Sequence, residues 1–170
     1  MTAALSQYGE AFRNLINAKT WSGPQPIREL LKLNEETDWR FVCAAMDVIG
    51  DSESAIESFL RFGLEGPSRY EDTGEKYLRL YGLLSATYVQ QESVVELYRL
   101  MNVPNPKDAR KKVAALSIRV LRNKLASHSV NYINDKSGEL EAYAPVQISL
   151  RGEVPSVFRL PTGDAHATCF

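Results

Sequence analysis

The segment RNKLASH, residues 122–128, places an arginine and a histidine six positions apart, and side chains of these two types can handle a phosphate together. Arg122 carries a planar guanidinium that matches the geometry of phosphate oxygens. His128 carries an imidazole, which exchanges its proton near neutral pH. The alternative is that Arg122 faces solvent and His128 only ends a helix, so the surrounding elements must decide between the two interpretations.

No motif for a metal or a nucleotide accompanies this pair. The chain lacks the glycine-rich phosphate loops GxGxxG and GxxxxGK[ST], the zinc motif HExxH, a CxxC pair and the nucleophile motif GxSxG. Its two cysteines, Cys43 and Cys169, have no metal-binding spacing, and Cys43 is expected to act as a small buried hydrophobe. The second histidine, His166, stands in an aperiodic tail. We therefore expect no metal and no cofactor.

Charge is distributed unevenly, although the whole chain carries a formal net charge of only −1. Residues 34–75 hold eleven acidic and three basic side chains, whereas residues 107–124 hold seven basic side chains and one acidic one. This asymmetry indicates either an anion-binding face or two surfaces that meet in an assembly. The sequence shows neither a secretory signal nor the roughly 20 consecutive apolar residues of a membrane span. It predicts a cytoplasmic protein with no membrane partner.

The spacing of apolar residues predicts a protein built mainly of helices. Helices are expected at residues 3–19 and 27–33, then at 38–49 and 55–62 with a break at Gly50, and at 75–102. The last is the strongest, because one seam keeps a four–three–four spacing through Tyr77, Tyr81, Leu84, Tyr88, Gln91, Val95 and Tyr98. A tyrosine seam of this kind is more typical of core packing than of a binding site.

A basic helix is expected at residues 107–127, with Val113, Leu116, Val120 and Leu121 inward and its basic side chains outward. Residues 144–152 then alternate as in a half-buried strand, with which residues 156–160 can pair as a hairpin. The predicted fold class is all-α, an antiparallel helical bundle at residues 1–138 with a small C-terminal β-hairpin addition at residues 139–170.

Together with the long tyrosine-rich helix before it, RNKLASH resembles the motif of the HEPN family of small all-α proteins. That motif is an arginine, a polar residue that is often asparagine, and a histidine after four to six intervening positions; here five positions separate Arg122 from His128. The resemblance covers roughly residues 38–134. Positions six apart on an unbroken helix lie about 120° from one another, so a shared site requires the helix to end or bend around LASHS, or a second subunit to complete the site.

The resemblance implies a homodimer in which two motifs share one cleft and, as in many members of the family, a metal-independent endoribonuclease. Arg122 would hold the scissile phosphate, Asn123 would orient the phosphate or the imidazole, and His128 would move a proton to or from the 2′-hydroxyl or the leaving oxygen. The side chains expected along the RNA path are Lys111, Lys112, Arg119 and Lys124.

We therefore expect a ribonuclease of a toxin, antiphage or stress system, with RNA, a second copy of the chain and an antitoxin protein as partners. Family members paired with a nucleotidyltransferase antitoxin often carry a tyrosine two residues after the histidine, where this chain has Val130. Two alternatives remain: a non-catalytic HEPN-like dimer that binds RNA or a protein, and an unrelated helical bundle.

Overall fold

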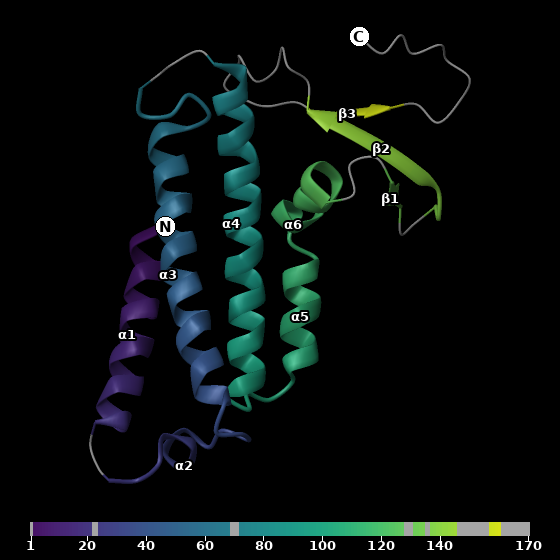
Figure 1. Ribbon diagram of the computed structural model, residues 1–170. Coiled ribbons are helices and arrows are strands. Elements are labelled where there is room, and N and C mark those ends of the chain that lie inside the picture. The colour runs from purple at the N-terminus through teal and green to yellow at the C-terminus, as the bar shows by residue number, and fades with distance from the viewer. Residues whose placement is uncertain are drawn as a thin grey trace.

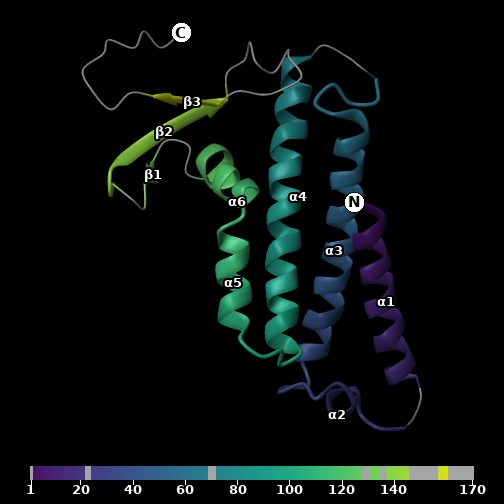
Figure 2. The same ribbon diagram turned by 180° about the vertical axis from the view of Figure 1, so that it is seen from behind.

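Helices α1, α3, α4 and α5 lie side by side and alternate in direction along the body of the protein, in both views of the computed structural model (Figures 1 and 2). The structure describes residues 2–21, 24–68, 72–127, 131–134, 137–145 and 157–160. Its helices are α1 (Thr2–Thr20), α2 (Ile27–Leu31), α3 (Asp38–Phe62), α4 (Thr73–Leu100), α5 (Pro106–Ala114), α6 (Ser117–Arg122) and the π-helical turn η1 (Asn123–Ser127). The prediction of a mainly helical, antiparallel bundle is confirmed. No helix in these ranges is both long and apolar enough to cross a bilayer.

The predicted break at Gly50 is wrong, because α3 continues through this residue to Phe62. The hydroxyl of Ser52 donates to the carbonyl of Ile49 at 2.9 Å, and that of Ser54 donates to the carbonyl of Gly50 at 3.2 Å. These serines therefore bond to the helix they belong to and do not start a new one. Long contact with the antiparallel α4 outweighs the weak helix preference of a single glycine, which costs only about 1 kcal/mol.

Helix α4 follows the expected boundaries closely. The side chain of Asp72 caps it by accepting a hydrogen bond from the amide of Glu75 at 2.8 Å. Leu84 and Val95 of the predicted seam are buried, as expected. Tyr81 and Tyr98 are exposed, so the seam is a core seam only in part.

The expected single helix at residues 107–127 is instead three pieces. It breaks at Leu116, whose backbone is extended (φ −64°, ψ 133°) and whose side chain is exposed, not inward. After the break, α6 takes a different direction from α5 (Figure 1). The last piece, η1, widens from α-helical to π-helical hydrogen bonding at Asn123.

A small antiparallel sheet covers the outer side of α6, away from α1 (Figure 2). Its strands are β1 (Tyr132–Ile133), β2 (Leu140–Pro145) and β3 (Val157–Leu160), in the order β1-β2-β3. The predicted pairing of residues 156–160 with the preceding strand is confirmed, with Val157 opposite Pro145 and Leu160 opposite Ala142. That strand begins earlier than predicted, at Leu140, and residues 146–150 of the predicted strand lie outside the described part of the chain.

Two apolar clusters hold these elements together. The first joins α1, α2, α3 and the end of α4 through Ile16, Leu31, Leu33, Val42, Met46 and Leu100. The second joins α4 to η1 through Leu80, Leu84 and Leu125, with Tyr143 of the sheet packed against it. The second cluster fixes the position of the segment that follows Arg122.

Candidate anion-binding site at the turn between α6 and the π-helix

The two arginines of α6 both pack against the ring of Tyr88 on α4. The guanidinium carbon of Arg122 lies 3.9 Å from the centroid of the Tyr88 ring, and that of Arg119 lies 4.4 Å from it. Both distances are within the range in which a cation is attracted to an aromatic face. The expectation that the basic side chains of this segment point outward is therefore wrong for both arginines.

Arg119 is neutralised by the protein itself. One guanidinium nitrogen donates to a carboxylate oxygen of Glu92 at 2.5 Å, and another donates to the amide oxygen of Gln91 at 3.5 Å. The side chain of Arg119 is only 15% exposed. An arginine that is buried against a carboxylate has little capacity left for a phosphate, so the structure does not place Arg119 on an open RNA path.

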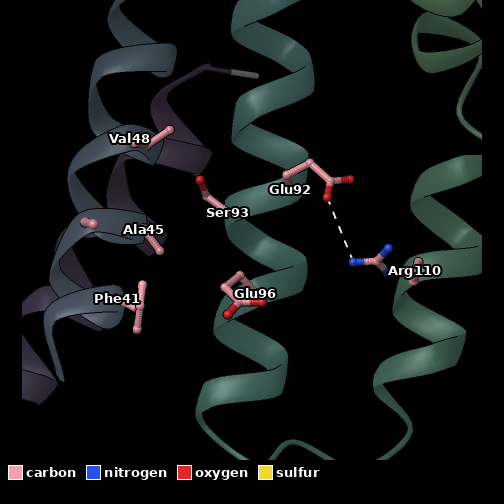
Figure 3. Close-up of a pocket in the computed structure, with 8 residues that line it drawn as sticks. Phe41, Ala45, Val48, Glu92, Ser93, Glu96 and Arg110 are labelled. Carbon is pink, nitrogen blue, oxygen red and sulfur yellow. Dashed lines mark ion pairs between the residues drawn. The ribbon is translucent and has the colours of Figure 1, made fainter. Parts of the chain in front are cut away.

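Glu92 also reaches α5. Its second carboxylate oxygen lies 3.9 Å from a guanidinium nitrogen of Arg110, and Figure 3 shows this pair spanning the space between α4 and α5. One carboxylate on α4 thus binds an arginine from each side of the break at Leu116. This shared counter-charge is a physical reason for the break, because on a straight helix residues nine positions apart lie about 180° from one another and could not both reach one carboxylate.

Glu92 and Arg110 line a groove of about 350 Å³ between α3, α4 and α5 (Figure 3). Its α3 wall is apolar and is formed by Phe41, Ala44, Ala45 and Val48. On the α4 wall, a hydrogen bond from Arg99 lowers the pKa of Glu96, so that carboxylate stays ionised and paired. Both carboxylates of the groove already face arginines, so neither is left unpaired to bind a cationic ligand.

Arg122 differs from Arg119 in having no carboxylate partner within the described ranges. Its side chain instead donates a hydrogen bond to the side-chain oxygen of Asn123 at 3.2 Å. A guanidinium has five N–H donors, so this contact leaves donors for a ligand. The Tyr88 ring and Asn123 hold the cation without cancelling its charge, and a half-buried cation held in this way suits a phosphate or another oxyanion.

The helix changes its geometry directly after Arg122, and the changed turn runs into LASHS, the segment around which a shared site would require a bend or an end. The π-helical turn begins at Asn123 and runs to Ser127, the last described residue before residues 131–134. Single π-helical turns inside helices occur often at functional sites. His128 lies outside the described residues, so its predicted role stays a prediction.

The other residues predicted to line the RNA path fall into two groups. Lys111 and Lys112 are exposed on α5, where they can meet a polyanion. Lys124 is half-buried and turned toward the sheet, with its ammonium nitrogen 4.5 Å from the ring centroid of Tyr143. No group of three or more histidine, cysteine, aspartate or glutamate side chains in the described segments is arranged to hold a metal ion.

Sequence reasoning missed two parts of this site. It assigned Tyr88 to the core seam and did not single out Glu92, although the two stand four positions apart on one face of α4. Arg119 and Arg122, which are three positions apart, likewise share one face of α6. This correspondence between the two pairs is the signal in the sequence that could have indicated that they meet.

Comparisons of this chain with protein-family models, curated proteins and solved structures find no match. The resemblance to the HEPN family therefore rests on the RNKLASH motif and on the long helix before it.

Proposed function

We propose that this protein is a metal-independent endoribonuclease of the HEPN type, in which Arg122 binds the scissile phosphate. One observation carries the proposal: of two arginines on the same tyrosine, Arg119 is paired with Glu92, whereas Arg122 is oriented by Tyr88 and Asn123 and has no carboxylate partner among the described residues. A preorganised cation of this kind stabilises the charge that develops on phosphate oxygens during cleavage.

In the proposed reaction, an imidazole removes the proton of the 2′-hydroxyl while the 2′-oxygen attacks the adjacent phosphorus. The bond from phosphorus to the 5′-oxygen breaks, and that oxygen takes up a proton. The products are a 2′,3′-cyclic phosphate and a 5′-hydroxyl end, and no water, metal or cofactor is consumed. His128 supplies the imidazole in this proposal, because it follows Arg122 at the spacing of the motif.

A homodimer belongs to the proposal, because two copies would bring two Arg122–His128 pairs into one cleft and would supply both an acid and a base. The uneven charge of the chain allows the basic α5–α6 region of each copy to lie against RNA. We further propose that the protein acts in a toxin, antiphage or stress system and that an antitoxin protein regulates it.

The test incubates the purified protein with a mixed, end-labelled RNA pool in EDTA. We expect cleavage that leaves 2′,3′-cyclic phosphates, and a loss of about 10²–10⁴ in rate for His128→Ala, the usual contribution of a proton-transfer group. His166→Ala is the matched control, because it removes the only other histidine of the chain and should leave the rate unchanged.

Cleavage that requires magnesium, or that survives His128→Ala, would refute the catalytic mechanism. Binding of RNA without cleavage would favour the other interpretation of the motif, a non-catalytic scaffold in which Arg122 holds a phosphate that is never cut.

A further inference from the structure

The sheet at the C-terminal end holds Lys124, the second residue after Arg122, between two tyrosine rings. The ammonium nitrogen of Lys124 lies 4.5 Å from the ring centroid of Tyr143 and 5.3 Å from that of Tyr132. The two rings meet edge to face, with centroids 5.7 Å apart and an interplanar angle of 81°. This arrangement surrounds a cation with aromatic faces on two sides, which is a favourable setting for it.

A buried carboxylate fixes the orientation of one of these two rings, that of Tyr143. Glu141 of β2 is 2% exposed, accepts a hydrogen bond from the hydroxyl of Tyr143, and accepts another from the side-chain amide of Asn134 at 2.8 Å. Removing a hydrogen-bond partner from a buried carboxylate is costly, so Tyr143 is held in this orientation. The ring is therefore a rigid support for Lys124.

The next residue, Leu125, anchors the opposite side of the same turn. Its side chain is 3% exposed and lies in the cluster with Leu80 and Leu84 of α4, against which Tyr143 also packs. A π-helical turn is rare, and tertiary contacts must select it over a continued α-helix. Here α4 supplies those contacts on one side and the sheet supplies them on the other.

We propose that the C-terminal sheet is a positioning element of the anion-binding site, and that Tyr143 and Tyr132 fix the turn after Arg122 through Lys124. Lys124 is then a positioning residue and does not contact RNA. This inference rests on the proposed function for its catalytic consequence, but the rigidity of the turn is a property of the protein alone and can be measured separately.

The first experiment measures hydrogen exchange of the amides in η1 for Lys124→Met and Lys124→Arg. We expect the methionine variant to exchange about tenfold faster in this turn, with α3 unchanged, because about tenfold corresponds to roughly 1.4 kcal/mol, the size of a partly desolvated cation–π contact. Arginine keeps a cation between the rings and should restore slow exchange. Unchanged exchange in the methionine variant overturns the inference, whether or not the protein cleaves RNA.

The second experiment separates positioning from RNA contact in the cleavage assay. We expect Lys124→Met to lower kcat about tenfold with KM within about twofold, and Lys124→Arg to recover kcat. A raised KM with unchanged kcat, together with a salt slope lowered by about 0.7, would instead show that Lys124 binds a phosphate and would overturn the inference. Absence of cleavage in the unmodified protein refutes the proposed function, and the exchange result then decides the inference.

Tyr143→Phe is a smaller change that tests the support of the ring beside Lys124. It keeps the ring beside Lys124 but removes the hydroxyl that bonds Glu141. We expect faster exchange in both η1 and β2, because the carboxylate loses a partner and the ring loses its support. Faster exchange in β2 alone would show that the sheet and the turn are uncoupled and would contradict the proposal.

Discussion

Replacing the two arginines of α6 one at a time should separate stability from activity. Arg119→Met and Arg122→Met both keep an unbranched side chain about as long as the stem of arginine, so the packing of that stem is largely retained while the guanidinium over Tyr88 is lost. The two variants differ in what the lost guanidinium was bonded to. Arg119 loses the carboxylate of Glu92, whereas Arg122 loses the amide oxygen of Asn123.

The expected magnitudes follow from these contacts. A hydrogen bond to a charged group contributes about 1.5–3 kcal/mol, and a partly desolvated cation–π contact adds about 1 kcal/mol. Arg119→Met should therefore lower the free energy of unfolding by about 2.5–4 kcal/mol, since among the described residues it also leaves Glu92 with only the 3.9 Å contact to Arg110. Arg122→Met loses a contact to a neutral group and a cation–π contact, which together contribute about 1.5–2.5 kcal/mol.

The loss of cleavage rate should rank the two variants in the opposite order, with Arg122→Met losing more than Arg119→Met. Arg122→Met removes the cation that we propose for the scissile phosphate, and loss of one such donor typically costs about 10²–10³ in kcat. Arg119→Met should keep its rate within about tenfold, because Glu92 already neutralises this arginine. Urea unfolding at 25 °C and RNA cleavage in EDTA measure the two effects on the same protein samples.

Equal loss of activity in the two variants, or a greater loss of stability in Arg122→Met, would refute these roles of Arg119 and Arg122. Arg122→Lys is the charge-preserving control. It should keep stability close to that of the parent but still cleave slowly, because an ammonium cannot reproduce the paired donors of a guanidinium.

Two further predictions concern the charged surface and the response to pH. Replacing Lys111 and Lys112 together with glutamine should lower the slope of log binding constant against log salt by about 1.4, at about 0.7 for each phosphate contact, and an unchanged slope in a filter-binding titration would place the RNA elsewhere. Burial, and after it two neighbouring carboxylates, raises the pKa of Glu53, one of whose oxygens has no hydrogen-bond partner among the described residues. Its ionised form therefore destabilises the folded state at neutral pH, so Glu53→Gln should raise the unfolding free energy at pH 7. That gain should disappear as the pH falls below 4.5, the ordinary value for this group, and urea unfolding at several pH values measures it.

The sequence alone determined the mainly helical fold and the approximate limits of α1, α2 and α4. The regular spacing of apolar residues in α4 is a local feature, and it predicted a helix that the structure places at Thr73–Leu100. The change of periodicity after residue 138 is equally local, and it predicted a β addition after the bundle. Such signals depend only on neighbours along the chain, and a sequence reveals them directly.

Tertiary structure decided what each basic side chain does. Arg119 and Lys124 look alike in the sequence as members of one basic stretch, yet Glu92 neutralises the first and two tyrosines of the sheet hold the second. Gly50 likewise reads as a helix stop, but the contact between α3 and α4 carries the helix through it. These outcomes depend on groups far apart in the sequence, whose combined energies outweigh local preferences of about 1 kcal/mol or less. Arg122 has no carboxylate partner in the described part of the chain for the same reason: the fold brings it a ring and an amide, and gives the carboxylate to its neighbour.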